Sequence, residues 1–431
     1  MQVKNYLELQ QALEAGEETI ELVNSINAVN GIGLKPGQKL VGSGEGILLS
    51  FIHGDGVALS ANNELKNLAL QTAPGRRAIY IDSALEDLGE IQLQDLTVTG
   101  MVQLLTRAPN KTLSLKLENL DIVSADARSY PERPMKYGVN VYQGALTVYN
   151  FNPQEGSEIT LRGENISVGR PLAPVLGSGI FISGFGDDAG PVTVERLTTG
   201  EVHSNGMIPT GQPNLITGAI FVVYGVHAKE IISQGPTTTY GTNDMVLDVW
   251  GQVDQWTVKG KVTSYGSSGI GFVNFGVVKN FHAQAPIETY GLGARGFNQY
   301  DGTIENARFT RIKTAGDGSI GMQFSKPVGT ITIEEAVTTQ GATGETLVKG
   351  VLKELQAHAI SVLEGGSIRQ LNLLGDLHVQ GEDVAAYHIS GGTVEKLNLK
   401  GKITVDSEKS QAVVLEDGGT SDLTDLKKYL N

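Results

Sequence analysis

The stretch YGTNDMVLDVWG (240–251) recurs as YGSSGIGFVNFG (265–276) and again as YGLGARGFNQYDG (290–302). The glycine that follows the first aromatic position recurs every 25 residues, at Gly241, Gly266, Gly291, Gly316 and Gly341. Each repeat contains short β-branched runs separated by glycine or polar turns, with no helical pattern inside it. A repeat of this kind indicates a solenoid whose stacked coils complete one another's core. The sequence therefore predicts an all-β fold, a parallel β-helix.

Equivalent positions in successive repeats form columns of side chains. A hydroxyl column is expected to point inward and contains Ser204, Thr239, Ser264, Thr289, Thr314 and Thr339. Stacked coils would place these hydroxyls about 4.8 Å apart, and we expect them to bond as an internal ladder. A large apolar column is expected in the core and contains Ile182, Phe221, Leu247, Phe272, Phe297 and Met322.

The chain resembles the right-handed parallel β-helix of the pectin-lyase-like superfamily over nearly its whole length. LQQALEAGEETIELVNSI, followed by LKPGQKLVGSGEGILLSF, is similar to the helical cap and first coils of that superfamily. The phrases NDMVLDVWG and SGIGFVNFG also resemble uncharacterised bacterial β-helix proteins. The superfamily includes lyases, hydrolases, esterases, epimerases, fructosyl-transferring enzymes and phage adhesins, so the resemblance implies a fold without fixing a reaction.

The predicted organisation is a single domain over residues 1–431. Residues 1–30 are expected to form an N-terminal helical cap and residues 420–431 a short C-terminal one, because open strand edges invite aggregation. Residues 31–419 are expected to form about a dozen coils of about 25 residues. Long loops on one side of a solenoid usually build its binding face. The insertions lie at 126–138, 149–158, 168–179 and 203–215, with a shorter turn at 184–190.

Composition excludes several classes of function. The 431 residues contain no cysteine and carry a formal net charge of −14. Thiolate chemistry is therefore excluded, and neither nucleic acid nor an anionic membrane is an expected partner. The seven histidines show no metal-ligand spacing, so neither a metal ion nor another cofactor is expected. No apolar run reaches the roughly 18–20 residues of a membrane span, and no signal peptide is evident.

These features leave location and assembly open between stated alternatives. We expect a cytoplasmic protein if the chain is full length, and a secreted one if a signal has been removed. A homo-oligomer is an open alternative to a monomer, although no column indicates an interface.

Three further columns are expected to face outward, because their parity is opposite to that of the apolar core column. They contain, in turn, Phe185, Tyr224, Trp250, Phe275 and Tyr300; Ser183, Val222, Asp248, Val273, Asn298 and Gln323; and Phe181, Ile220, Val246, Gly271, Gly296 and Gly321. Aromatic rings beside amides, a carboxylate and glycines suit the binding of sugar rings. Two alternatives stay open: the rings stack on one another beneath a covering loop, or they belong to the core.

Glycosidic cleavage commonly needs two carboxyl groups. Asp248 is the first candidate, and its partner is predicted to be Asp301, Asp244 or Asp187. Asp248 and Asp301 lie two coils apart, about 10 Å by the strand spacing, which is near the upper limit for an inverting pair. Asp301 could instead form an ion pair with Lys326, which holds the same register one coil on.

A lyase or epimerase acting on uronates is the second hypothesis. It needs a cation against the uronate carboxylate, for which Arg295 and Lys326 are candidates, and a proton donor, for which Tyr300 is a candidate. Arg295 occupies a position that is apolar in the neighbouring repeats. It either points inward or is displaced by the local turn, and a buried arginine must be paired.

The leading hypothesis is a carbohydrate-active enzyme that acts on glycosidic linkages of a neutral oligosaccharide through paired carboxylates. The reaction would be hydrolysis or intramolecular glycosyl or fructosyl transfer. A third hypothesis is a non-catalytic glycan-binding or structural β-helix. In each ligand-binding case the partner is an oligosaccharide or polysaccharide. The residues expected to contact it are Trp250, Tyr300, Tyr224, Asn298, Gln323, Arg295, Lys326, Phe185, Glu288 and His203.

Overall fold

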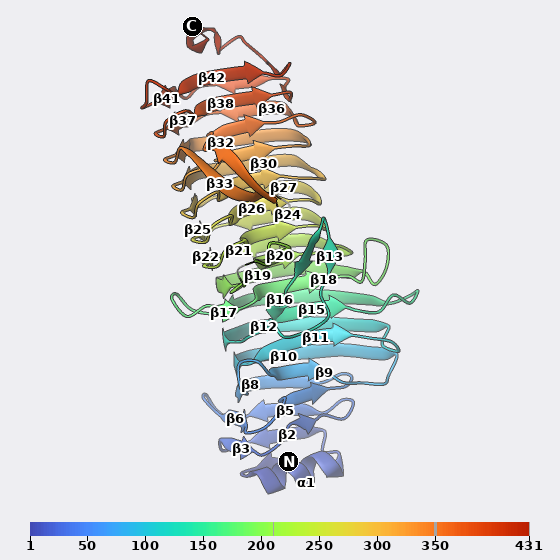
Figure 1. Cartoon of the computed structure of the whole chain (residues 1–431). Helices are drawn as coiled ribbons and strands as arrows, with labels where there is room; N and C mark the ends of the chain where they lie inside the picture. Colours follow the sequence, from blue (N-terminus) through green and yellow to red (C-terminus); the bar gives the residue numbers. More distant parts are fainter. Residues whose placement is uncertain (210, 349–350, 431) are drawn as a thin grey trace. The chain divides into compact units, whose positions relative to one another are not determined.

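The computed structural model describes residues 1–209, 211–348 and 351–430 (Figure 1). The chain divides into two compact units, and each is described by itself. Unit 1 comprises Met1–Pro134, Tyr142–Ser204 and Phe221–Ile231, and unit 2 comprises Met135–Val141, Asn205–Ile220 and Ile232–Asn431. Parallel strands in stacked order dominate both units. The all-β prediction is thereby confirmed, and the stacking is consistent with a parallel β-helix.

Unit 1 contains two stacks of parallel strands in which each strand pairs with the next. The first has the order β1 (Gln2–Val3), β2 (Thr19–Leu22), β5 (Lys39–Gly42), β8 (Glu64–Gln71), β10 (Asp87–Thr99), β12 (Thr112–Ser124), β16 (Glu158–Val168), β19 (Val192–Asn205) and β21 (Val226–Ser233). Short strands β3 (Ile26–Ala28) and β6 (Leu48–Phe51) pair with each other, and β6 continues onto β8. The second stack has the order β4 (Ile32–Gly33), β7 (Val57–Leu59), β9 (Arg77–Ile81), β11 (Met101–Thr106), β15 (Gly144–Asn150) and β18 (Ser178–Ser183). Strand β17 (Val175–Leu176) lies next to Asp126 through an isolated bridge.

Helix α1 (Tyr6–Ala15) opens unit 1 and packs on β1, β2 and β3. Its start is set by Asn5, whose side chain accepts a hydrogen bond from the Glu8 amide, while Glu8 accepts one from the Lys4 amide. This arrangement resembles a capping box, except that Glu8 accepts from the residue before the N-cap. The helix ends at Gly16, which adopts the left-handed conformation that a C-terminal cap requires.

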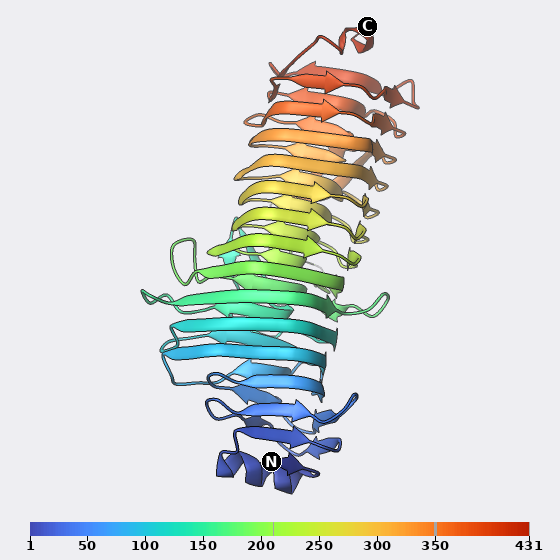
Figure 2. The same ribbon diagram turned by 180° about the vertical axis from the view of Figure 1, so that it is seen from behind.

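Unit 2 contains three series of parallel strands, which Figure 2 shows from behind as the yellow to red part of the chain. One series is β24 (Gln252–Val258), β27 (Val277–Ala283), β30 (Thr303–Thr314), β32 (Pro327–Thr339) and β36 (Ser367–Leu373), continued by β39 (Thr393–Val394), β40 (Leu397–Leu399) and β43 (Thr420–Ser421). A second is β22 (Thr237–Thr239), β25 (Val262–Ser264) and β28 (Ile287–Thr289), which leads onto β30, with β37 (Asp376–Val379) and β41 (Ile403–Val405) continuing from β32. The third, called the site stack below, is β23 (Asp244–Val249), β26 (Ile270–Asn274), β29 (Arg295–Gln299), β31 (Met322–Phe324), β35 (Ile360–Val362), β38 (Ala385–Ser390) and β42 (Gln411–Glu416).

Two antiparallel hairpins of unit 2 stand apart from the stacked coils. Strand β13 (Met135–Lys136) pairs with β14 (Val139–Val141), and β14 also pairs in parallel with β20 (Leu215–Val222). Strand β33 (Thr343–Val348) pairs with β34 (Val351–Gln356) and runs obliquely across the site stack (Figure 1). The short 3-10 helix η1 (Lys427–Tyr429) lies near the C-terminus.

The 25-residue repeat is the number of residues along the chain from one position to the position stacked on it. Thr237 pairs with Val262, Val262 with Ile287, Ile287 with Ile312, and Ile312 with Val337. The apolar column is buried as expected, from Ile182 in unit 1 to Met322 in unit 2. In unit 2, the rings of Phe272 and Phe281 stack at 4.1 Å across the core.

The hydroxyl column is buried, but the predicted ladder of hydrogen bonds is wrong. The hydroxyls of Thr239, Ser264 and Thr289 have no hydrogen-bond partner among the described residues. Thr314 and Thr339 donate instead to backbone carbonyls, those of Ser319 and Ala357, each at 2.7 Å. The reason is distance: stacked equivalent atoms lie about 4.8 Å apart, beyond the roughly 3 Å reach of an O–H···O bond.

The column of Val246, Gly271, Gly296 and Gly321 does not face outward as predicted. A Cβ atom on Gly271 would clash with the Cγ2 atom of Ile287, and one on Gly296 with the Cγ2 atom of Ile312. Both isoleucines belong to the core. The simple alternation of side chains is therefore broken between Gly271 and Phe272, and the preceding position, Ile270, lies on the other face of the strand.

Among the described residues, no helix is both long and apolar enough to cross a membrane. The prediction of one domain with a cap at each end stays a prediction.

We expect Gly271→Ala to lower the free energy of unfolding by about 1–3 kcal/mol, because the added methyl group is forced into a filled core. Chemical or thermal unfolding monitored by circular dichroism measures the change. Gly75→Ala is the matched control, since no atom of the described residues, apart from Gly75 itself and its chain neighbours, lies within 4 Å of the Cβ that it adds. Equal effects of the two substitutions would contradict the inward direction of position 271.

Candidate functional site

A small cavity lies in unit 2 between the site stack and the hairpin β13–β14. Its volume is about 50 Å³. Residues from three segments far apart in the sequence line it, among them Tyr137 and Val139 from the hairpin, Ile216 from β20, and Asp248 and Phe275 from the stack or its turns. The stacked coils thus provide the floor of this cavity, and the hairpin covers it.

Aromatic rings form one wall of the cavity. Phe275 and Tyr300 occupy equivalent positions in successive coils, and their rings stack at 5.0 Å. The ring of Tyr137 stacks on Phe275 at 4.5 Å and meets the edge of Trp250 at 5.4 Å. Trp250 is consequently only 3 % exposed. The expected open aromatic strip is therefore covered in unit 2, which was the alternative of rings stacked beneath a loop.

Tyr137 is held in an uncommon backbone conformation. It forms, with Gly138, the two-residue turn of the hairpin, and the φ angles of these residues are 56° and 83°. Such turns favour asparagine or glycine, because a side chain at positive φ is strained. A bulky tyrosine at this position indicates that its ring contacts offset the energy of the backbone strain.

Asp248 is the one carboxylic acid among the described residues that line the cavity. It is fully buried, and neither of its carboxyl oxygens has a hydrogen-bond partner at normal geometry within the described part of the chain. Burial raises the pKa of Asp248 well above its ordinary value, against the opposing influence of the Trp250 side chain and the Val249 amide. A buried carboxyl group without hydrogen-bond partners lowers the stability of the fold. Such groups are typical of functional sites.

Asp244, predicted as a partner of Asp248, has a structural role. Its carboxylate accepts hydrogen bonds from the amides of Gly206 at 2.9 Å and Gly241 at 2.8 Å, and from the hydroxyl of Thr217 at 2.7 Å. Burial raises the pKa of Asp244 to about 6, and these three donors limit the rise. With its oxygens engaged in this way, Asp244 ties the turn of β23 to the segment before β20.

Arg295 and Asn298 are the second orphaned group of the site stack. Arg295 is 1 % exposed, and its Nε and Nη2 atoms have no hydrogen-bond partner among the described residues. The side-chain amide of Asn298, three residues along β29, is also buried and lacks a partner there. Within the described part of the chain, the partner expected for a buried Arg295 is thus not found at these two atoms. Its position is equivalent to that of Ile270, which lines the cavity, so the broken alternation turns Arg295 toward the same face.

The other sequence candidates of unit 2 lie outside the cavity. Asp301 forms the anticipated ion pair with Lys326 at 3.7 Å, and both side chains are about half exposed. Glu288 forms an ion pair with Lys261 at 2.6 Å and a hydrogen bond with Tyr290. Burial works to raise the pKa of Glu288, but Lys261 and Tyr290 hold it below its ordinary value. The structure thus does not place Asp301 among the residues that line the cavity with Asp248.

Four candidates belong to unit 1. Asp187 is exposed on its turn, and the ring of Phe185 lies 5.4 Å from that of Phe151. His203 is buried and contacts Glu201 at 3.1 Å, and burial lowers the pKa of His203. The fourth, Tyr224, is half-buried. None of these four lines the cavity of unit 2.

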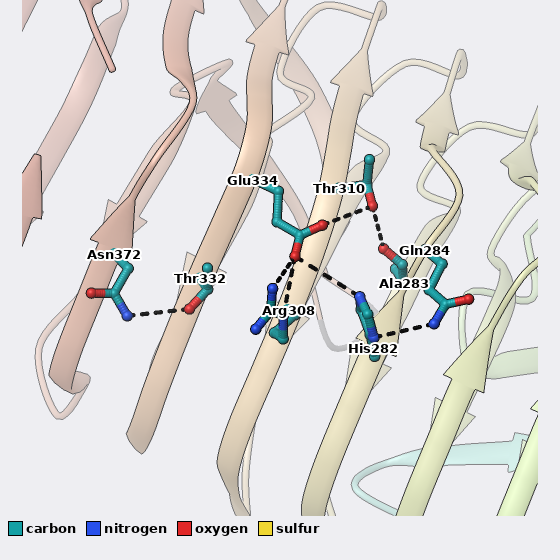
Figure 3. Close-up of polar contacts among 8 residues, drawn as sticks. All are labelled: His282, Ala283, Gln284, Arg308, Thr310, Thr332, Glu334 and Asn372. Atoms are coloured by element: carbon teal, nitrogen blue, oxygen red, sulfur yellow. Dashed lines mark hydrogen bonds and ion pairs between the residues drawn. The ribbon is translucent and has the colours of Figure 1, made fainter. Parts of the chain in front are cut away.

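A polar cluster on β27, β30 and β32 offers a contrast with the orphaned groups (Figure 3). Arg308 pairs with Glu334 and lowers its pKa. The Thr310 hydroxyl lies 2.9 Å from the carbonyl oxygen of Ala283 and 3.3 Å from Glu334. These polar groups bond to one another near the surface, where such pairs contribute little to the stability of the fold. Because they are already paired, they do not indicate a ligand site.

Within the described residues, no group of three or more His, Cys, Asp or Glu side chains is placed to hold a metal ion. Comparison of the chain with protein-family models, with curated proteins and with solved structures finds no match.

We expect Asp248→Asn to stabilise the fold in a pH-dependent way. Burial raises the pKa of Asp248 in the folded protein. The stability that this group contributes is therefore fully present below its pKa in the unfolded chain, near 3.9, and is lost as the pH rises toward its pKa in the folded protein. The melting temperature of the variant should match that of the parent near pH 4 and exceed it near pH 8, by the equivalent of more than about 1 kcal/mol. Asp301→Asn, at an exposed position, is the control and should show no such divergence. A constant difference at all pH values would show that Asp248 is not a strained buried acid.

Proposed function

We propose that unit 2 binds an acidic saccharide on the outward side of the site stack, and that the protein is a lyase or epimerase acting on uronate residues. The observation that carries this proposal is the buried guanidinium of Arg295, whose Nε and Nη2 atoms have no hydrogen-bond partner among the described residues. An arginine cannot lose its proton to escape burial, so an anion has to neutralise it. A planar carboxylate fits the two free N–H groups of its fork.

The neighbours of Arg295 support a sugar as the carrier of that carboxylate. Asn298, on the same strand, supplies an unengaged amide that can donate to and accept from hydroxyl groups. In the preceding coil, Ile270 lines the aromatic cavity that contains Asp248 and Tyr300. Arg295 would thus neutralise the uronate carboxylate, while Asp248 and Tyr300 provide groups that can exchange a proton.

Binding requires the hairpin cover to move. Ligand pockets usually have volumes of about 300–1,000 Å³, and the cavity beside Asp248 has about 50 Å³. Tyr137 is the residue that closes it, and its strained turn conformation lowers the cost of displacing it.

A neutral oligosaccharide cleaved through Asp248 is the second candidate function. The raised pKa of Asp248 suits a general acid, and the rings of Phe275 and Tyr300 suit a sugar face. However, the described residues that line the cavity include no second carboxylate to complete the pair. If the saccharide binds without turnover, the protein is a non-catalytic glycan-binding protein.

The fold we propose in finer detail is the right-handed β-helix of the pectin-lyase-like superfamily, with about a dozen coils. In this arrangement α1 covers the N-terminal end and residues 420–431 cover the C-terminal end. The support is the 25-residue register between stacked strands and the capped helix that precedes the first coils.

We expect Arg295→Gln to lower the affinity for a galacturonate trisaccharide by about 10–100-fold, the value of a charge-assisted hydrogen bond. Titration calorimetry against this trisaccharide and against the neutral galactose trisaccharide measures the preference, and ultraviolet absorbance detects an unsaturated product. Arg311→Gln, at an exposed position on β30, is the matched control and should bind like the parent. Equal affinity of the parent protein for the acidic and the neutral trisaccharide would refute the proposal.

Arg295→Met should raise the melting temperature while it removes uronate binding, because an apolar side chain of similar length replaces an unpaired buried charge. Differential scanning calorimetry without ligand checks this expectation. A strongly destabilised Met variant would indicate that Arg295 is paired within the protein, and would assign it a structural role.

A further inference from the structure

The polar column that contains Asp248 continues into coils where the aromatic column has ended. Gln323 pairs with Ser361 on the next strand, and Ser361 pairs with His388. All three side chains are at least nine-tenths buried. The pairing register of β31, β35 and β38 therefore places an amide, a hydroxyl and an imidazole side by side.

Ser361, His388 and Glu416 form a hydrogen-bonded chain. The Ser361 Oγ atom lies 3.1 Å from His388 Nδ1, and His388 Nε2 lies 2.8 Å from Glu416 Oε1. The carboxylate fixes a proton on Nε2, which leaves Nδ1 of the neutral ring free to accept the serine proton. Nucleophile, base and orienting carboxylate are thus connected in the order that an activated serine requires.

His358 adds a donor to this group. Its ring stacks on that of His388 at 4.1 Å, and its Nδ1 atom accepts a hydrogen bond from the Ala385 amide at 2.9 Å. Burial and the nearby His388 lower the pKa of His358 to about 3, so the ring is neutral and carries its proton on Nε2. An N–H group of this kind can stabilise a developing oxyanion without carrying a full charge.

A cavity of about 330 Å³ opens beside the chain, next to the hairpin β33–β34. Ser361, His388, His358 and Gln323 all line it, together with Gln356 of the hairpin. A second cavity of about 200 Å³ shares His358 and His388 with the first and is also lined by Glu416. The first cavity is within the size range of small-molecule sites, and the nucleophile is at its wall.

We propose that Ser361, His388 and Glu416 form a serine-nucleophile site that hydrolyses small carboxylic esters bound in this cavity. The Ser361 oxygen attacks the ester carbonyl carbon while its proton passes to His388 Nδ1. His358 Nε2–H and the Gln323 amide stabilise the oxyanion. The carbon–alkoxy bond then breaks, and the alkoxide leaves as an alcohol with the proton from His388. The oxygen of a water molecule then attacks the acyl carbon while its proton passes to His388. The bond between the acyl carbon and the Ser361 oxygen breaks, the proton returns from His388 to Ser361, and the carboxylic acid is released.

The Ser361 site is independent of the proposed uronate site, because it contains neither Arg295 nor Asp248. A short acyl ester suits the cavity, which has to hold the acyl group, the scissile oxygen and part of the alcohol. No charged side chain of the group is required to contact the substrate, so a neutral ester is the expected class.

The first test is covalent labelling with an alkyl fluorophosphonate, read by intact mass and peptide mapping. The folded protein should gain one phosphonyl group, located on Ser361, and should hydrolyse p-nitrophenyl acetate faster than buffer. Ser361→Ala should lose both properties, and His388→Gln should slow both by roughly 10²–10⁴-fold. Ser390→Ala is the matched control: it lies two residues from His388 on β38, and its hydroxyl bonds Asp417 at 2.7 Å near the surface. It should react like the parent.

Glu416 is a positioning residue, and Glu416→Gln tests it. Its side chain is half exposed, so the variant should fold. Loss of the carboxylate should slow both the labelling of Ser361 and ester hydrolysis, because the Nε2 proton of His388 loses the acceptor that orients the ring, and Glu416→Asp should restore part of both rates. Other titratable groups that face His388 directly or across the two cavities are unchanged in this variant: His358, Glu354, Asp383 and Lys409. Absence of labelling at Ser361 in the folded parent, or a Ser361→Ala variant that hydrolyses the ester at the parental rate, would overturn the proposal.

Discussion

The parallel backbone pairing between successive coils is the constraint on which the rest of the structure depends. It places Val262 over Thr237, and Ile287 over Val262, at a constant sequence interval of 25 residues. Because the backbone bonds fix this interval, every side chain has a neighbour of the same register about 4.8 Å away. Apolar columns then become a continuous core, and polar columns become rows of functional groups. One such row in unit 2 contains Asp248, Asn298, Gln323, Ser361 and His388, and Val273 separates Asp248 from Asn298.

The sequence alone predicted the stacked, parallel all-β arrangement, because the glycine and apolar positions repeat at the interval that separates stacked residues. The burial of Leu247, Phe272 and Phe297 follows directly from it. Strict alternation along the strand was not a safe guide, because the chain turns two successive positions, Gly271 and Phe272, toward the core. That irregularity depends on the close approach of neighbouring backbones, which no single repeat records. It also explains the orientation of Arg295, which the sequence left open.

The candidate site was predictable in part. Asp248, Tyr300 and Arg295 were identified from their columns, whereas Tyr137 was not, although its insertion had been expected to contribute to the binding face. The rings that Tyr137 contacts lie more than one hundred residues further along the chain, and such contacts leave no periodic pattern in the sequence. The pairing of Asp248 with Asp301 stays a prediction, although Asp301 is not among the residues that line the cavity: register gives the separation along the stack, but it does not reveal which side chains a covering segment encloses. The group of Ser361, His388 and Glu416 gives no comparable signal in the sequence, because the aromatic column ends before Ser361 and His388.

The cover formed by Tyr137 has a consequence for the order in which unit 2 assembles. Most contacts of a solenoid join residues one coil apart, so coils can form by successive addition of neighbours. The hydroxyl of Tyr137 instead lies 3.4 Å from the carbonyl oxygen of Phe275, which is 138 positions further along the chain. Closing a loop of this length costs entropy, and the contacts that offset this cost exist only after the coils beneath the hairpin have formed. The hairpin should therefore dock after the stack has formed and open before it melts, so that its amides exchange with solvent through a local opening while those of β23 and β26 exchange only with the stack.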